Sequence, residues 1–311
     1  MRNSLVLFLV ILAVGFMLPI VAGNEYFLHI FILMGIFSVL ACYWNMLDGY
    51  MGVIHFGYAA FFGLGAYTSA ILSTRFAWPI LFSIPLAGVM SAIVGGLVII
   101  PCLRMGTYAT AIVTLAFGEI MRIIASSWTG LTKGEMGLWG ISPIFEGANR
   151  APFVYLISAV LAISIFALSL IIRSTTGLAF VAIKDDEAAA STTGIPVYGL
   201  KLLGTIISCF VAGIVGAFYA HYILTITPAI FGIAYTIQIM AMSLFGGKAT
   251  LLGPLAGAVV LIFLGESFRF LENYRMIIYG VVIIGTVMLF PEGLAGIAKY
   301  TGRSFLARWS R

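Results

Sequence analysis

The sequence predicts an all-α, polytopic membrane protein whose chain crosses a lipid bilayer about ten times. Hydrophobic residues make up 62% of the 311 residues and charged residues only 9%, whereas roughly 25% of an ordinary soluble domain is charged. Long uninterrupted apolar runs exclude the alternating pattern of a membrane β-barrel. Because every backbone polar group inside the hydrocarbon layer needs an internal hydrogen-bond partner, these runs are predicted to be helices.

The individual crossings follow from the apolar runs between polar breaks, since a hydrocarbon layer about 30 Å thick needs about 20 apolar residues per helix. In chain order, the predicted crossings are Ser4–Ala22, Tyr26–Leu47, Tyr58–Leu72, Trp78–Ile100, Thr107–Ile124, Pro152–Ile172, Leu202–Leu224, Ile230–Phe245, Pro254–Phe270 and Met276–Phe290. The first run follows Arg2, as a signal peptide would. A second long run begins almost at once without a clear cleavage site, so we expect the first to be retained as a crossing.

Orientation is predicted from Lys and Arg, which are enriched in cytoplasmic loops. With both termini in the cytoplasm, ten of the sixteen basic residues lie on that side. They are Arg2, Arg104, Arg173, Lys184, Lys201, Lys248, Lys299, Arg303, Arg308 and Arg311. The polar stretch 126–151 is then outside, and the stretch 173–201 and the tail 291–311 are inside. We expect residues 1–311 to form a single transmembrane domain.

Small and potentially reactive residues have plain structural interpretations. The 35 glycines allow helices to approach closely in lipid, where apolar burial no longer drives association. The cysteines Cys42, Cys102 and Cys209 show no metal-ligand spacing and are interpreted as packing residues, as are the scattered histidines. The formal net charge of +5 is attributed to cytoplasmic loops and the tail rather than to a nucleic-acid partner.

A short cytoplasmic helix is predicted within the stretch 173–201. Asp185, Asp186 and Glu187 crowd its start, where negative charge suits the helix dipole, and a run of alanines follows. Gly194 suits a left-handed C-terminal cap, and Pro196 ends the helix. A helix of about nine residues, roughly 13 Å long, is not stable alone in water and needs a surface to lie on. That surface is either a partner protein or the chain's own helical bundle.

Several segments together resemble the branched-chain amino acid ABC permease family, and its M-type subunit more than its H-type subunit. The segments are Gly49–Gly57, Ala60–Tyr67, Ala111–Arg122, Thr129–Gly134, Gly216–His221, Gly246-Gly247 with Gly253-Pro254, and Leu289–Leu294. Each segment is weak alone, but their joint order is specific.

The resemblance implies that the short cytoplasmic helix is the coupling helix that docks in a groove of an ATPase subunit. The alanine pair and glycine of the family motif fall on Ala189, Ala190 and Gly194. The leading Glu of the motif falls on Ala188, while Glu187 stands one place earlier. Ten crossings with this loop between the sixth and seventh resemble the vitamin B12 importer type of permease.

The same resemblance implies a permease subunit of an ATP-driven importer for branched-chain amino acids in the bacterial inner membrane. Its partners would be a second related permease subunit, two cytoplasmic ATPase subunits and a periplasmic substrate-binding protein. Because the sequence contains no phosphate-binding loop of the Gly-x-x-x-x-Gly-Lys-Ser/Thr type, ATP and Mg²⁺ are expected on the ATPases and no cofactor or metal on this chain. We therefore expect no enzymatic activity of its own.

Charged residues inside the crossings are the candidate functional residues, because an ionised group at the bilayer centre costs about 2.5–3.5 kcal/mol on insertion scales. Glu119 and Arg122 are three residues apart and share one helix face. They either line the translocation path or neutralise each other between helices. Gln238 is the main polar residue of its crossing, and Asp48 and Glu266 lie near crossing ends. Each of these three is a minor candidate, and the predicted path comprises Glu119, Arg122 and Gln238.

Alternative functions remain open on these residues. Urea and short-amide importers share much of this pattern. A stand-alone secondary transporter or channel would usually carry buried ionisable relays, which are scarce here. A membrane-embedded enzyme would need a metal-ligand or nucleophile–base set, which the sequence lacks.

Overall fold

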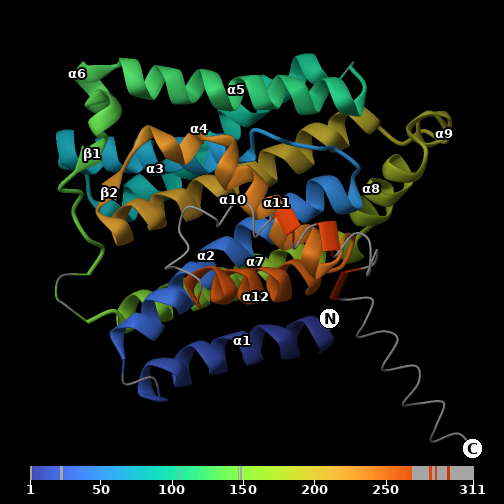
Figure 1. Cartoon of the computed structure of the whole chain (residues 1–311). Coiled ribbons are helices and arrows are strands. Elements are labelled where there is room, and N and C mark those ends of the chain that lie inside the picture. The colour runs from blue at the N-terminus through green and yellow to red at the C-terminus, as the bar shows by residue number, and fades with distance from the viewer. Residues whose placement is uncertain are drawn as a thin grey trace, which may run out of the picture.

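The computed structural model describes residues 2–21, 24–103, 105–145, 147 and 149–267, with 280–281, 284–285 and 293–294. These residues form a helical bundle (Figure 1). Its α-helices are α1 (Arg2–Val21), α2 (Glu25–Asn45), α3 (Tyr58–Arg75), α4 (Ile80–Cys102), α5 (Thr107–Ser127), α6 (Thr129–Thr132), α7 (Ala151–Arg173), α8 (Thr175–Asp185), α9 (Glu187–Thr192), α10 (Val197–Ile223), α11 (Ile233–Gly246) and α12 (Gly253–Ser267). Between them lie a π-helix η1 (Met46–Tyr50), the 3-10 helices η2 (Gly134–Met136) and η3 (Pro228–Phe231), and the strands β1 (Leu138–Trp139) and β2 (Thr225–Ile226).

The first nine predicted crossings each coincide with an observed helix, with ends that differ by a few residues. Among the described residues, five helical segments have the length and apolar composition to span a bilayer: Glu25–Tyr50, Ile80–Cys102, Thr107–Ser127, Ala151–Arg173 and Val197–Ile223. α11 and α12 are apolar but shorter. The predicted tenth crossing and the tail lie almost entirely outside the described residues. The chain is therefore a mostly helical, multi-pass membrane protein.

Most connections between helices lie at two ends of the bundle (Figure 1), whereas the 3-10 helix η3 before α11 lies nearer the middle, where Phe231 packs against Gly63 and Gly118. At one end lie α8 and α9. There, Lys184 packs over Gly52, and the Lys248 ammonium lies 2.8 Å from the Asp48 carboxylate. At the opposite end, β1 pairs antiparallel with β2, and the Arg75 guanidinium donates to the backbone carbonyl of Gly130. We call these the α9 end and the β1–β2 end.

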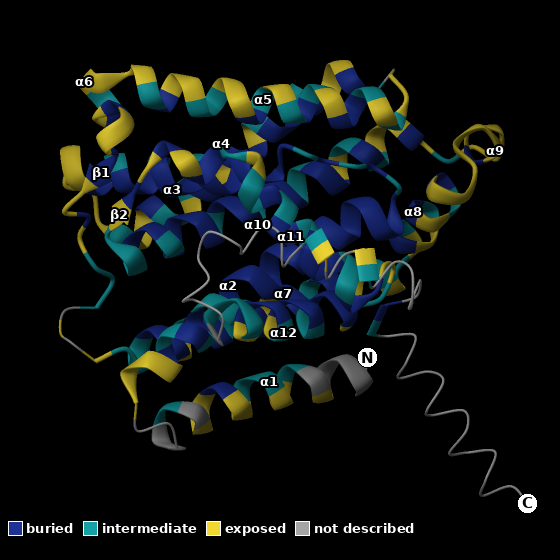
Figure 2. Cartoon of the chain, viewed as in Figure 1, coloured by how far each residue is buried: buried dark blue, intermediate teal, exposed yellow. Residues whose placement is uncertain are grey.

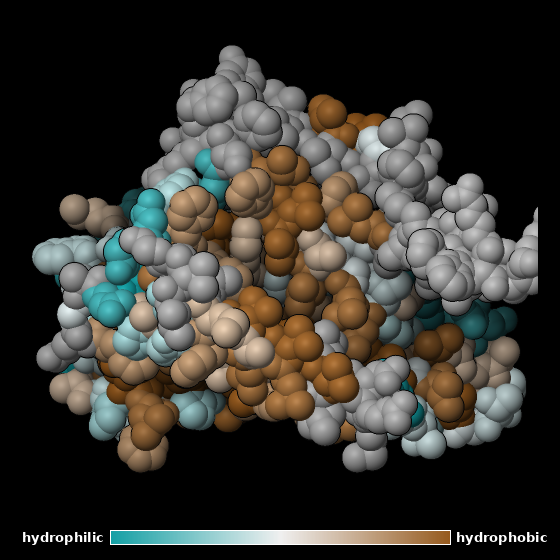
Figure 3. Space-filling view, turned by 90° about the horizontal axis from the view of Figure 1, so that it is seen from below, coloured by the Kyte–Doolittle hydropathy of each residue, from teal (hydrophilic) through white to brown (hydrophobic). Residues whose placement is uncertain are grey.

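The centre of the bundle is formed by α2, α3 and α10, which are largely buried, whereas α1 and α5 lie at its edges with one side exposed (Figure 2). Large aromatic side chains such as Trp44, Tyr58 and Phe61 are completely buried in this centre. On the face seen from below, hydrophobic side chains cover the middle and hydrophilic ones gather toward the ends (Figure 3). This distribution is expected of a helical bundle whose middle contacts lipid and whose ends contact water.

Close backbone contacts join α3, α4 and α10. A Cβ atom placed on Gly65 would lie 2.2 Å from the carbonyl oxygen of Gly213, and one on Gly216 would lie 2.0 Å from that of Phe62. Neither distance leaves room for a side chain. The sequence interpretation that glycine permits close helix packing is confirmed at these positions.

A network of buried polar side chains connects α3, α4 and α10 near the β1–β2 end. The imidazole of His221 is within 2.8 Å of the Ser69 hydroxyl and 2.7 Å of the Ser142 carbonyl oxygen. Ser69 in turn lies 2.8 Å from Ser83 Oγ on α4. Because both ring nitrogens have partners, His221 is a structural residue, as predicted. The three cysteines are buried in helix contacts, in agreement with their interpretation as packing residues.

We predict that Gly216→Ala destabilises the bundle, although alanine favours helices over glycine. The added methyl group would overlap the carbonyl of Phe62 on α3, and overpacking of this kind costs about 1–3 kcal/mol. Thermal unfolding of the protein in detergent measures the effect. Gly96→Ala is the matched control, since its new methyl would meet Ile206 at an ordinary 3.4 Å. Equal melting temperatures for the two variants would contradict the close contact.

Candidate functional site

The segment between α7 and α10 forms two short helices rather than one, at the α9 end of the bundle (Figure 1). The prediction of a single helix of about nine residues starting near Asp185 is therefore wrong. Asp185 is the last residue of α8, Asp186 is extended (φ −155°, ψ 108°), and α9 contains only six residues from Glu187. The reason is local, because Asp186 Oδ1 accepts a hydrogen bond from the Ala189 N–H at 2.9 Å. Aspartate prefers this capping position, where it contributes about 1 kcal/mol.

The end of α9 follows the prediction. Gly194 has φ +84°, in the left-handed region that favours glycine. Its N–H donates to the Ser191 carbonyl at 3.2 Å, and the Ile195 N–H donates to the Ala190 carbonyl at 3.2 Å. These bonds satisfy the last carbonyls of the helix. Pro196 follows and prevents its continuation.

The two alanines of the predicted motif face in opposite directions. Ala190 is 5% exposed and packs against Ile183 and Val197, which fix α9 to α8 and α10. Ala189 is exposed, as are its neighbours Ala188, Ser191 and Thr192. The outer surface of α9 is therefore built of small side chains that allow another protein to approach its backbone closely. Only one member of the alanine pair belongs to that surface.

Glu187 has a partner within this chain. Its carboxylate Oε2 accepts a hydrogen bond from Lys201 Nζ on α10 at 2.6 Å. The Lys201 side chain is only 10% exposed, whereas that of Glu187 is 46% exposed. A lysine ammonium that is largely removed from water needs such a counter-charge. Glu187 therefore ties the start of α9 to α10.

The α11–α12 connection is clamped at the same end of the bundle. Asn45, which is 1% exposed, uses both ends of its amide. Its Nδ2 donates to the Thr250 carbonyl at 2.9 Å, and its Oδ1 accepts from the Ala249 N–H at 3.1 Å. The carboxylate of Asp48 lies one helical turn further along and pairs with Lys248 at 2.8 Å. The π-helix η1, which contains Asp48, thus connects α2 with this loop and, through Gly52, with α8.

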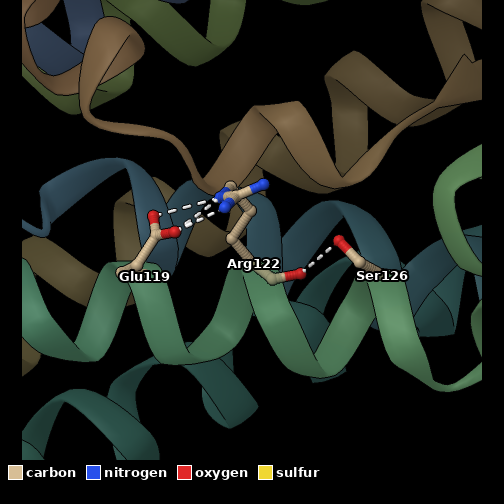
Figure 4. Close-up of polar contacts among 3 residues, drawn as sticks. All are labelled: Glu119, Arg122 and Ser126. Carbon is tan, nitrogen blue, oxygen red and sulfur yellow. Dashed lines mark hydrogen bonds and ion pairs between the residues drawn. The ribbon is translucent and has the colours of Figure 1, made fainter.

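The second group of predicted residues lies on α5. Arg122 Nε lies 3.0 Å from both carboxylate oxygens of Glu119, and Ser126 Oγ donates to the Arg122 carbonyl at 2.8 Å (Figure 4). The two charges pair with each other within one helix, as their spacing predicted, and the pair is partly exposed rather than enclosed between helices of this chain. Spacing of three residues along a helix brings the side chains together directly.

The Glu119–Arg122 pair is not enclosed by the described residues of this chain. The side chain of Glu119 is 51% exposed and that of Arg122 is 38% exposed. The same face of α5 presents large apolar side chains, among them Tyr108 at 83% and Ile112 at 65% exposure. Hydrocarbon solvates ionised groups poorly. This face therefore suits contact with another protein or with a water-filled space better than contact with lipid.

Gln238, the third predicted path residue, lies in a different place. It is 7% exposed and lines a cavity of about 260 Å³ between α2, α10, α11 and α12. Glu266 lines the same cavity, whereas α5 contributes none of its lining residues. The structure thus brings Glu119 and Arg122 together and places Gln238 with Glu266. α11, which contains Gln238, contacts both α5 and α12.

Sequence reasoning missed Lys201 and Asn45. Lys201 stands just before an apolar run and served only as an orientation marker, although a lone lysine beside a crossing predicts an acidic partner. Asn45 is a polar residue inside the predicted crossing Tyr26–Leu47, which was the available signal. Their partners are 14 and 205 positions away in sequence, respectively. No local spacing could have identified either pair.

Comparison with known families gives one match that covers most of the chain. The model of the branched-chain amino acid transport system permease component family matches residues 26–287. This range includes α2 to α12 and both groups of candidate residues. No solved structure matches the chain significantly.

Curated relatives agree with this match. The high-affinity branched-chain amino acid transport system permease proteins LivM of Salmonella typhimurium and Escherichia coli are each 28% identical over 291 residues, which cover 85% of this chain and 68% of the relative. The ribose import permease protein RbsC of Haemophilus influenzae is 23% identical, with 72% of each chain covered. Permeases that are named for branched-chain amino acids and for ribose are thus both similar in sequence to this chain.

We predict that Glu187→Gln loosens α9. The change removes the counter-charge of Lys201, and losing a partly exposed bond to a charged group costs about 1–2 kcal/mol. Amide hydrogens of residues 187–194 should exchange roughly five- to thirtyfold faster. Hydrogen exchange with mass spectrometry measures this change. Asp185→Asn is the control, because Asp185 is exposed and has no ion pair among the described residues. The swap Glu187→Lys with Lys201→Glu should restore slow exchange, and failure to do so would argue against the ion pair.

Proposed function

The chain belongs to the branched-chain amino acid transport system permease family, and from that premise we propose that it is the membrane-spanning subunit of an ATP-driven importer of leucine, isoleucine and valine. The observation that carries this proposal is the family match over residues 26–287, together with an exposed charged pair on an apolar helix of the bundle. The LivM relatives are named for branched-chain amino acids, which supports this substrate class.

The translocation path runs along the exposed face of α5, between this chain and a second related permease subunit. Glu119 and Arg122 are its polar residues, and Gln238 contributes from the cavity beside α11. The exposure of the ion pair supports this location, because a lipid-facing surface with two charges would be costly. A partner helix and a hydrated path would solvate the pair.

Coupling to ATP hydrolysis takes place at α9. Its exposed small residues would fit the groove of a cytoplasmic ATPase subunit, and the Glu187–Lys201 ion pair holds the helix in place for that contact. A short helix is not stable by itself, but α9 is capped at both ends and packed through Ala190. In this arrangement the ATPase pushes against a preformed element.

The remaining architecture follows from the same proposal. Ten crossings form one transmembrane domain of the vitamin B12 importer type in the bacterial inner membrane, with the α9 end and both termini in the cytoplasm. Two ATPase subunits bind ATP and Mg²⁺, while this chain binds neither. A periplasmic binding protein delivers substrate to the β1–β2 end. An importer of urea or short amides is the alternative within the same mechanism.

Uptake by reconstituted vesicles tests the proposed function directly. Vesicles that carry this chain with its partner subunits should accumulate leucine, isoleucine or valine only when ATP and the binding protein are both present. Uptake by this chain alone, without nucleotide, would identify a secondary transporter instead. Uptake of urea in place of leucine would keep the mechanism and change the substrate.

Variants of the ion pair test the path in the same vesicles. Glu119→Gln combined with Arg122→Gln removes both charges and keeps polar side chains on an exposed face, so assembly of the complex should persist. Uptake should fall while basal ATP hydrolysis remains. Unchanged uptake by this double variant would mean that the pair is not part of the path.

Variants of α9 should separate coupling from folding. Gly194→Val forces a β-branched residue into a left-handed conformation, which costs about 1–2 kcal/mol. Ala189→Trp places a bulky side chain on the outer surface of α9. Both variants should insert in the membrane, because neither change lies in an apolar crossing. Both should lose substrate-stimulated ATP hydrolysis and retain less ATPase on purification.

The matched control for these variants is Gly199→Val. Gly199 is exposed on α10, has open space around its Cα, and is not among the positions with positive φ. It should leave ATPase binding and uptake intact. Normal coupling in Gly194→Val and Ala189→Trp as well would mean that α9 is a passive connector that rests on its own bundle.

A further inference from the structure

The cavity beside α11 has a polar side and an apolar side. Its volume is about 260 Å³, somewhat below the 300–1,000 Å³ that is typical of sites for drug-sized ligands. Leu33, Phe37 and Ile262 form the apolar wall. The polar groups are Gln238, Glu266 and the two tyrosines described below. A space of this size suits a small solute or a few water molecules.

Gln238 is the polar residue that points to a ligand. Its side chain is 7% exposed, yet its amide makes no hydrogen bond to any other residue that the structure describes. Polar groups inside native proteins are generally hydrogen-bonded to protein or to a bound molecule such as ordered water. Because Gln238 lines the cavity, a bound molecule can supply the missing partner.

The other polar groups complete a charge pattern. Glu266 provides a carboxylate, which also accepts a hydrogen bond from the Tyr26 hydroxyl at 3.2 Å. Tyr219 and Tyr235 line the cavity from α10 and α11. A carboxylate binds an ammonium group well, whereas amide N–H and phenolic O–H groups donate to a carboxylate. The polar side of the cavity therefore offers a partner for the ammonium group and a partner for the carboxylate of a zwitterion.

We infer that this cavity is a binding site for a small zwitterionic amino acid with an apolar side chain. The ammonium group binds Glu266, the carboxylate accepts from Gln238, and the side chain packs against Leu33, Phe37 and Ile262. A charged side chain would be desolvated against that wall without a partner and is rejected. The inference rests on the proposed function, because it names where within the permease the substrate binds.

The position of the site fits loading of substrate from the β1–β2 end. Tyr235 lies in the first turn of α11, Tyr219 in the last turn of α10, and Glu266 is next to the end of α12. The ends of α10 and α12 lie toward the end of the bundle opposite to α9 (Figure 1), whereas α11 begins nearer the middle, since the preceding Phe231 lies beside Gly118 of α5. α11 also contacts α5, the helix that contains Glu119 and Arg122.

Protection of an introduced cysteine tests the site without relying on transport. The full complex that carries Ala234→Cys, whose side chain lines the cavity, is treated with a maleimide in the absence of ATP and binding protein. Leucine should slow alkylation about tenfold once its concentration exceeds its dissociation constant tenfold, while glutamate should not. Gln238→Leu, which removes the amide at similar volume, should abolish the protection in a complex that still assembles.

The control is Ile233→Cys, at the neighbouring exposed position of α11 that is outside the cavity lining. Its alkylation should be the same with and without leucine, and the native cysteines are buried. Equal alkylation of Ala234→Cys with and without leucine, in a complex whose wild type takes up leucine, would overturn the site and leave the proposed function intact. Protection by urea or glutamate instead would overturn the ligand class. Absence of ATP-dependent leucine uptake by the wild type would count against the proposed function itself.

Discussion

Direct backbone contact between α3, α4 and α10 is the constraint on which the rest of the structure depends. In lipid, apolar side chains gain little from packing against one another, so helices associate through close van der Waals contact and a few hydrogen bonds. Gly65, Gly213 and Gly216 bring the backbones together without intervening side chains. The contact sets the position of α10, and α10 then positions the functional elements at both of its ends.

At the α9 end, α10 holds the segment proposed to receive the ATPase. Lys201 lies in its second turn and binds Glu187, and Val197 packs against Ala190. At the β1–β2 end, the same helix contributes His221 to the buried polar network and Tyr219 to the cavity beside α11. One continuous helix of 27 residues therefore connects α9 with the proposed substrate site.

Some polar side chains of the bundle are hydrogen-bonded within the chain, whereas others face a cavity or the surface. Asn45, His221 and Lys201 are bonded within the chain and act as structural clamps. Gln238 lines the cavity beside α11, and the Glu119–Arg122 pair is satisfied but exposed on α5. A membrane protein gains nothing in stability from the last two arrangements. Their persistence in an otherwise apolar bundle points to contacts with substrate or with another subunit.

The sequence by itself determined the membrane class, the first nine helices, the end of α9 at Gly194 and the family. These features depend on local composition and on residues close together in the chain, such as the apolar runs and the glycine and proline after α9. The sequence did not determine that Asp186 splits the predicted helix, that Ala190 faces inward, or that Glu187 binds Lys201. It also named Glu119, Arg122 and Gln238 as one group, whereas the structure places Gln238 with Glu266. Only the tertiary structure decided these pairings, because in a bundle held by close backbone contact the rotation of each helix about its axis is set by its neighbours rather than by its own sequence.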